Sequence, residues 1–330
     1  MRRLAARAGA AGLAATLTLI GAAASADAAT QTGTTTWRVV HKVSVADSFT
    51  GIAATGPRHA WTIFSRGAVR SLLSFNGHRW QTVRALPSGL VPEFLAASAP
   101  DNIWVFGAMN GVEWTAASRW NGTSWQQDNL PAGAGYGTVA VVSASEVWYA
   151  SGSSVWRWNG SSWLSSSSEP DVSVASAPGG QVWQVGRSPA AGRHSVLVAR
   201  RWSGNAWHSV RVPHTVLTAA PQVSVASGRD VWILVTERGS DPYRLLHWHG
   251  RGWQTIRVPA QMTTESQFAA VTAVGRDGAW FSGTGLWTGR KWLAAQPPLY
   301  DGGDTSITGV PGTSAAFATV AYRIFQNGKL

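Results

Sequence analysis

Two acidic pairs are the residues of this sequence best suited to bond-breaking chemistry. Glu237 and Asp241 stand four positions apart, and Asp301 and Asp304 enclose two glycines. In glycoside cleavage one carboxyl group donates a proton while the other attacks the sugar or activates water. The same residues are equally typical of turns, because Asp side chains bond to the backbone there. We therefore assign no catalytic residue from the sequence.

Other side chains near these acids are better suited to holding a ligand. Trp114 follows Glu113 and lies outside the repeating Trp pattern described below. An indole beside a carboxylate could stack on a sugar ring, or it could equally fold back onto a neighbouring element. The remaining candidate ligand-binding residues lie in predicted loops of the same face: Tyr136, Arg187, Arg193, His194, Glu237, Arg238, Asp241, Tyr243, Tyr300, Asp301 and Asp304.

Ligands for a metal ion are scarce in the sequence. The chain has no Cys, which excludes disulfides, thiolate metal sites and a cysteine nucleophile. His247 and His249 place two imidazoles on one face of a strand, but His249 falls in a hairpin turn and no third ligand is apparent. Asp301 to Asp304 lacks a full set of oxygen ligands for Ca²⁺. We expect no metal and no cofactor.

The amino terminus has the pattern of an export signal. Three arginines precede an apolar run that ends at Ala24-Ser-Ala26, so residues 1–26 are predicted to be a cleaved signal peptide. Residues 27–36 form a polar segment that we expect to be a flexible tail. The predicted product is a secreted, extracellular protein with no membrane anchor after cleavage.

The charge of the mature chain favours anionic partners. Without the leader, 24 basic and 16 acidic side chains remain, a net charge of +8. This charge would attract acidic polymers. No run of four Lys or Arg occurs, so we do not expect nucleic-acid binding. The expected partner is a glycan, a cell-wall polymer or a protein, and the expected state is a monomer.

A tandem repeat must position all of these residues. Eighteen of the twenty tryptophans fit one frame that recurs seven times. Its clearest half reads aromatic-x-Gly-x-x-Trp, at 75–80, 120–125, 158–163, 202–207, 248–253 and 287–292. One further Trp lies upstream of each: Trp61, Trp104, Trp148, Trp183, Trp232 and Trp280. Such a period indicates one supersecondary unit copied along the chain, with each copy unable to bury its own apolar face.

Each unit is predicted to be a propeller blade of four short antiparallel strands, a to d from the centre outward. Asn121-Gly122 in the second unit favours a tight c–d hairpin. The inner strands, rich in small residues, are expected near 50–54, 94–98, 137–142, 172–176, 222–226, 268–273 and 306–310. The large rings of strands b, c and d should fill the wedges between diverging blades.

The two chain ends are predicted to close the ring. The last repeat supplies strands a, b and c but no strand d, whereas Trp37 to Val40 matches the strand-d sequence at 80–83. The leading strand should therefore complete the last blade and remove two open edges. The fold class is an all-β, seven-bladed propeller over residues 37–330.

The function is expected to lie on the face with the longer loops. The c–d turns are short, whereas the predicted b–c loops (108–114, 187–195, 236–243) and d–a loops are longer. Loops on a rigid scaffold commonly carry function. This face holds all the candidate residues named above.

The repeats resemble those of the kelch and galactose-oxidase central-domain propellers, of tectonin-like proteins and of tryptophan-rich secreted propellers of actinobacteria. The resemblance covers nearly all of the mature chain and implies a fold, not an activity. The radical chemistry of galactose oxidase requires a Cys, which is absent here, and Trp120 replaces the Asp of the sialidase Asp-box. We expect a non-catalytic binding module; the alternative is a hydrolase or lyase acting on a polysaccharide.

Overall fold

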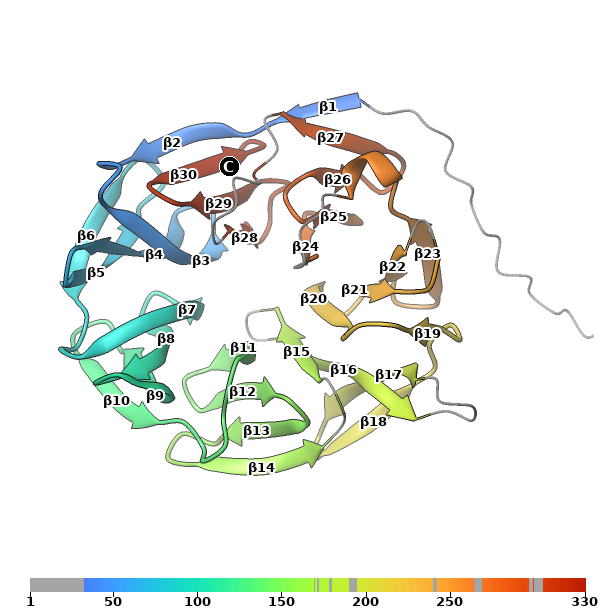
Figure 1. Ribbon diagram of the computed structural model, residues 1–330, viewed down its shortest axis with the longest axis horizontal. Coiled ribbons are helices and arrows are strands. Elements are labelled where there is room, and N and C mark those ends of the chain that lie inside the picture. Colours follow the sequence, from blue (N-terminus) through green and yellow to red (C-terminus); the bar gives the residue numbers. More distant parts are fainter. Residues whose placement is uncertain are drawn as a thin grey trace, which may run out of the picture.

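The computed structural model describes residues 33–330 except 169, 171, 178–179, 190–194, 240–241, 264–268, 297–298 and 300–304. The described residues form seven β-sheets around a central axis, as the sequence predicts (Figure 1). Each sheet is one blade, and its core strands pair antiparallel with their neighbours. The chain is a seven-bladed β-propeller. Among these residues, no helix has the length and hydropathy needed to cross a membrane.

The blades follow one another along the chain, with strand a at the centre and strand d at the rim. Blade 1 contains β3 (Ser48–Gly56), β4 (His59–Arg66), β5 (Val69–Phe75) and β6 (Trp80–Ala85). Blade 2 contains β7 (Leu90–Ala99), β8 (Asn102–Met109), β9 (Val112–Trp120) and β10 (Trp125–Asn129). Blade 3 contains β11 (Gly137–Ser143), β12 (Glu146–Ser151), β13 (Ser154–Trp158) and β14 (Trp163–Ser168).

Blades 4 to 7 repeat this order with small additions. Blade 4 contains β15 (Ser173–Ser176), β16 (Val182–Pro189), β17 (Ser195–Ser203) and β18 (Ala206–Val210), and β19 (Val216–Leu217) pairs with β17. Blade 5 contains β20 (Gln222–Ser227), β21 (Asp230–Thr236), β22 (Tyr243–Trp248) and β23 (Trp253–Arg257), followed by the 3₁₀-helix η1 (Ala260–Met262). Blade 6 contains β24 (Val271–Val274), β25 (Gly278–Phe281), β26 (Gly285–Trp287) and β27 (Trp292–Gln296). Blade 7 contains β28 (Thr305–Gly309), β29 (Ala316–Val320), β30 (Arg323–Asn327) and β2 (Arg38–Lys42).

The inner strands overlap the seven predicted positions and touch one another around the centre (Figure 1). Side-chain bonds join some of them: Thr138 Oγ1 accepts from the N–H of Val174 at 2.8 Å, and Ser224 Oγ accepts from that of Ala273 at 2.9 Å. β28 also contacts β3, so the circle of inner strands is continuous. Small side chains permit this close approach of seven strands.

Aromatic rings fill the wedges between blades, as predicted. At each of the seven interfaces, the strand-b ring of one blade packs with the strand-c and strand-d rings of the next. The strand-b rings are buried, and six of them (Trp104, Trp148, Trp183, Trp232, Trp280 and Phe317) are 0% exposed. The seven sets are Trp61 with Trp120 and Trp125, Trp104 with Trp158 and Trp163, Trp148 with Trp202 and Trp207, Trp183 with Trp248 and Trp253, Trp232 with Trp287 and Trp292, Trp280 with Phe325 and Trp37, and Phe317 with Phe75 and Trp80.

The hairpin at Asn121 shows why the c–d turns require glycine. Gly122 has φ +92°, and Asn121 Oδ1 accepts from the N–H groups of Thr123 and Ser124 at 3.0 and 2.9 Å. A Cβ on Gly122 would lie 3.2 Å from Cβ of Asp101 in the a–b turn of the same blade. The glycine therefore satisfies both a positive φ and a close contact between turns.

The predicted closure by the amino-terminal strand is confirmed. β2 pairs antiparallel with β30 and completes blade 7. The ring of Trp37, just before β2, packs at a tilt of 36° against that of Trp280 of blade 6, with the centroids 4.5 Å apart, and its Nε1–H donates to the Gly283 carbonyl at 3.3 Å. Side chains thus join the first described residues to the end of the ring.

The segment before Trp37 differs from the sequence prediction. Residues 33–36, which we expected in a flexible polar tail, form β1 (Gly33–Thr36) and pair parallel with β27 of blade 6. Asn327 donates from Nδ2 to Thr35 Oγ1 and to the Thr36 carbonyl, both at 2.8 Å. The β-branched threonines suit a strand, and the open edge of blade 6 supplies the hydrogen-bond partner that the sequence alone did not reveal.

Candidate functional site

The structure brings together part of the predicted ligand site, at the junction of blades 2 and 3. The rings of Trp114 and Tyr136 meet edge to face at 5.5 Å, and Trp114 also lies 6.0 Å from Phe94. Tyr136 is 77% exposed, and Glu113 next to Trp114 is also exposed. The Trp114 ring thus contacts Phe94 of its own blade and Tyr136 of the segment that leads into blade 3, whereas its stacking on a sugar stays a prediction. We call Trp114, Tyr136 and Glu113 the loop-face patch.

The backbone of this patch corrects one sequence assignment. Residues 108–114 are not a long loop: β8 ends at Met109 and β9 begins at Val112. The strand pairing shifts between Gly107 and Met109, so Glu113 and Trp114 lie in a bulge of β9. Trp114 has φ +54°, a conformation that is uncommon for a bulky residue and aims the ring away from the regular strand face.

The other predicted site residues are not gathered at one place in the described part of the chain. Arg187 lies within strand β16 and not in a loop, and Tyr243 begins β22 with its ring against Phe281 at 5.3 Å. Glu237 forms an ion pair with Arg244 at 3.8 Å, while Arg238 is exposed. The remaining six lie outside the described residues: Arg193, His194, Asp241, Tyr300, Asp301 and Asp304.

The opposite face, formed by the a–b and c–d turns, carries a repeated arrangement of side chains between blades. We define a socket by three positions and number it by its first blade. The first position lies two residues before the strand-b ring, and the second is the strand-c residue paired with that ring. The third position lies three residues before the strand-b ring of the next blade. In that order of positions, the first socket holds His59, Ser74 and Asp101; the second, Asn102, Arg119 and Ser145; the third, Glu146, Arg157 and Gly180; the fourth, Gln181, Arg201 and Arg229; the fifth, Asp230, His247 and Asp277; the sixth, Gly278, Leu286 and Ser314; and the seventh, Ala315, Gln326 and Arg58.

One socket position has a structural role that repeats. The residue two before the strand-b Trp accepts the indole Nε1–H in three blades: Asn102 at 3.1 Å, Glu146 at 3.1 Å and Asp230 at 2.8 Å. Such a partner stabilises a buried indole N–H, although Nε1 of Trp183 and of Trp280, two other buried strand-b rings, has none. Glu146 and Asp230, at the a–b turns, therefore each hold the indole of their own blade.

In the third socket an arginine occupies the space between two indoles. The guanidinium of Arg157 lies 5.5 Å from the Trp148 ring and 5.4 Å from the Trp202 ring of the next blade. Its Nη2 is 3.6 Å from the Glu146 carboxylate. A flat, charged group thus fits between the strand-b and strand-c tryptophans of adjacent blades, and a residual groove of about 300 Å³ remains beside it.

In the first socket the corresponding strand-c residue is small, and the space stays open. Ser74 stands where Arg157 stands in blade 3, and a cleft of about 430 Å³ lies between blades 1 and 2. Trp61 and Trp120 contribute to its floor and are the counterparts of Trp148 and Trp202. The missing side chain explains why this interface has a cleft at its turn face.

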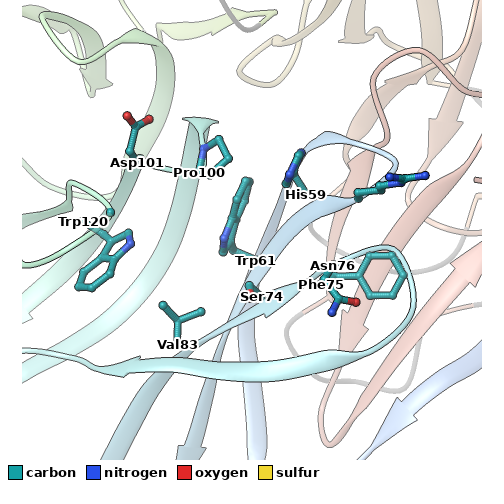
Figure 2. Close-up of a pocket in the computed structure, with 11 residues that line it drawn as sticks. His59, Trp61, Ser74, Phe75, Asn76, Val83, Pro100, Asp101 and Trp120 are labelled. Carbon is teal, nitrogen blue, oxygen red and sulfur yellow. The ribbon is translucent and has the colours of Figure 1, made fainter.

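Polar groups from both blades surround this cleft. Figure 2 shows Trp61 between His59 of its own blade and Pro100 and Asp101 of the next. The imidazole of His59 is parallel to the Trp61 ring within 8°, at 6.3 Å. Asn76 from the c–d turn also lines the cleft, and its Oδ1 accepts from the N–H groups of His78 and Arg79. The cleft combines an aromatic floor with hydrogen-bonding side chains at an exposed rim.

Sequence reasoning missed this site because its residues come from two blades. His59 and Asp101 are 42 positions apart, and no sequence motif connects them. Aligning the seven repeats on the strand-b Trp would have shown that Ser74 replaces an Arg found in blades 2, 3 and 4. That loss of volume is a signal visible in sequence.

Comparison with known proteins supports the fold and no more. No protein-family model and no curated protein sequence matches the chain. A catalytically inactive virginiamycin B lyase from Staphylococcus aureus, solved with quinupristin, is similar at TM-score 0.59 and 10% identity, covering 89% of this chain and 99% of that one. The propeller domain of the Trilobed protease from Pyrococcus furiosus gives 0.52 and 8%, covering 85% and 93%.

A fucoside-bound lectin from Aleuria aurantia is also similar, at TM-score 0.46 and 16% identity, covering 76% of this chain and 95% of that one. Identities this low indicate a shared propeller architecture only. The expected resemblance to tryptophan-rich propellers therefore stands at the level of fold, without a kelch or tectonin assignment.

Proposed function

We propose that the protein is a secreted, non-catalytic binding protein whose ligand is a glycan held in the cleft of the first socket. The observation that carries the proposal is the replacement of an arginine by Ser74 between two tryptophans. The third socket accommodates a planar group in the equivalent space. A sugar ring is a puckered chair of comparable size, and its apolar C–H face packs on aromatic rings.

The rim of the cleft fits the polar part of such a ligand. Asp101 can accept hydrogen bonds from sugar hydroxyls, and the His59 ring can donate or accept. Asn76 adds an amide on the blade-1 side. An apolar floor with a few convergent polar groups is the usual composition of a small-ligand site.

Export, inferred from the predicted signal peptide, is part of the same proposal. A net charge of +8 would favour acidic cell-wall polymers among the glycans that the protein meets outside the cell. We place no catalytic step in the cleft. The polysaccharide hydrolase or lyase alternative depends on pairs whose members Asp241, Asp301 and Asp304 lie outside the described residues.

The loop-face patch supports a second candidate position for the same function. Tyr136 is exposed to 77% and meets Trp114, which is held at positive φ. Backbone strain of this kind is often kept where it places a functional side chain. These two aromatic rings, with Glu113 beside them, could stack on one sugar unit.

The proposal can be tested with a glycan panel and cell-wall fractions immobilised for retention assays. Asp101→Ala and His59→Ala should each weaken retention by about 10-fold or more, the cost of one or two hydrogen bonds in the site. Ser145→Ala is the matched control, because Ser145 occupies the position of Asp101 in the second socket. It should bind as the unmodified protein does.

Three outcomes would contradict the assignment. Loss of binding in Trp114→Ala or Tyr136→Ala, with the cleft variants unaffected, would move the site to the loop-face patch. Retention of a basic peptide but of no sugar would show that the ligand is a peptide and not a glycan. Failure to bind any member of the panel would reject the glycan proposal.

A further inference from the structure

The fifth socket brings three metal-ligating groups together at the junction of blades 5 and 6. His247 Nε2 lies 3.0 Å from Asp230 Oδ1 and 3.9 Å from Asp277 Oδ1. One ligand atom from each residue lies within 4.8 Å of the other two. The sequence shows His247 and His249 without a third ligand; the fold supplies two carboxylates, one of them from the next blade.

The surroundings hold these groups in place. The His247 ring stacks on Trp232 at 4.0 Å, nearly parallel at 6°. Asp230 Oδ1 accepts from Trp232 Nε1 at 2.8 Å, and its Oδ2 accepts from the Asp277 backbone N–H at 3.2 Å. Such stacking and hydrogen bonds to the ligand side chains fix the orientation of ligands around a metal. His247 and Asp230 are buried, whereas the Asp277 side chain is 51% exposed and leaves a route from solvent.

The other sockets show that the repeat accounts for Asp230 but not for His247 or Asp277. Asn102 and Glu146 also accept an indole N–H, so that role accounts for Asp230 alone. Among the seven sockets, only the fifth combines an imidazole on strand c with carboxylates at both other positions. The fold does not require His247 or Asp277 for the repeat geometry, since the third socket has Arg157 and Gly180 there.

We propose that Asp230, His247 and Asp277 form a binding site for a divalent transition-metal ion, for which Zn²⁺ is the best match. One imidazole nitrogen with carboxylate oxygens is a zinc ligand set, and imidazole disfavours the hard ions Ca²⁺ and Mg²⁺. Bond lengths of about 2.0–2.2 Å place neighbouring tetrahedral ligands about 3.3–3.5 Å apart. The separations of 3.0 and 3.9 Å bracket that range, so small side-chain movements suffice.

Binding requires a proton rearrangement and has a structural consequence. In its hydrogen bond to Asp230 Oδ1, the Nε2 of His247 carries a proton. Metal binding needs the Nε2 lone pair, so the ring takes the tautomer protonated at Nδ1, and the hydrogen bond is replaced by two metal–ligand bonds. Water completes the coordination. Because Asp277 belongs to blade 6 and the other two ligands to blade 5, the ion cross-links neighbouring blades in a chain that has no Cys. This site is independent of the glycan cleft.

The test uses untagged protein stripped with a chelator and titrated with ZnCl₂ in a calorimeter, with metal content measured after dialysis. One Zn²⁺ per chain should bind, and it should raise the melting temperature as ligands of the native state do. Asp277→Asn should weaken binding by more than the roughly 10–100-fold that loss of an outer-shell partner costs. Asparagine tolerates the φ of +61° at this position, so the backbone is preserved.

Asp101→Asn is the matched control, because it makes the same change at the same position of blade 2. It should retain full zinc binding, and Ca²⁺ should give no comparable heat. Melting of Asp277→Asn in chelator should match that of the unmodified protein in chelator, which separates lost binding from lost folding. Absence of stoichiometric binding, or equal binding by the two variants, would overturn the proposal.

Discussion

Replacement of Trp37 by alanine should destabilise the whole propeller, because this one ring joins the two ends of the chain. Trp37 is 2% exposed, its ring contacts that of Trp280 with the centroids 4.5 Å apart, and its Nε1–H donates to the carbonyl of the buried Gly283. Its neighbours on either side form β1 and β2, which belong to blades 6 and 7. The substitution therefore loosens both pairings at once.

The expected magnitude follows from this burial. A tryptophan buries about 150–250 Å², which at about 25 cal/mol per Å² gives an upper bound of roughly 4–6 kcal/mol. Measured Trp→Ala costs in cores are about 3–5 kcal/mol, and the carbonyl of Gly283 also loses its donor, a further ~1 kcal/mol. We expect the free energy of unfolding to fall by about 4 kcal/mol. Trp37→Phe, which keeps most of the apolar area, should lose about 1–2 kcal/mol.

Equilibrium unfolding in urea, followed by fluorescence and circular dichroism together, measures this change. Trp125→Ala is the control, because Trp125 is the strand-d ring of blade 2, is half-buried and donates to the Ala85 carbonyl at 2.8 Å. It disturbs one interface without opening the ring, so its cost should be smaller. Deletion of residues 37–40 should exceed both. A loss below about 1 kcal/mol for Trp37→Ala, or one no larger than that of Trp125→Ala, would refute the role of the clasp.

Three further changes test other parts of the structure. Burial lowers the pKa of His41 on β2, so protonation of His41 favours the unfolded chain. The melting temperature should therefore fall as the pH drops below about 6.5, and His41→Gln should reduce this dependence of melting temperature on pH. Desolvation raises the pKa of Asp128, so Asp128→Asn should raise the melting temperature at pH 7 and make no difference below about pH 3. Gly122→Ala should cost more in urea unfolding than Gly204→Ala, because both have positive φ but only Gly122 has a neighbour within 4 Å; equal costs would remove the turn contact from the argument.

The fold was predictable because tryptophan recurs at the same positions of the repeats. The spacing of Trp61, Trp120 and their equivalents marks strands b, c and d in every blade, and burial of large rings is a strong and local requirement. The unmatched Trp37 was enough to predict ring closure. β1 was missed because its pairing depends on an edge of blade 6 that is remote in sequence, and its threonines are as typical of a polar tail as of an edge strand.

The candidate site was harder to predict, for a physical reason. Single-sequence reasoning favoured long loops and so pointed to Trp114 and Tyr136, which the structure does bring into contact. A cleft between blades depends on what is missing, and Ser74 has no chemical character that attracts attention by itself. The fifth socket shows the same limit, since Asp277 becomes a neighbour of His247 only when two blades pack side by side.

The pairing of the amino-terminal strands β1 and β2 with blades 6 and 7 also limits the order in which the protein can fold. Asn327 bonds to Thr35 and Thr36 across 292 and 291 positions, so these contacts form only after nearly the whole chain has been synthesised. The edge of blade 6 and the Trp280 ring are covered by β1 and Trp37, so they too stay open until residues 280–296 have been made. We therefore expect ring closure to be a late and slow step of folding, because so long a loop must be closed.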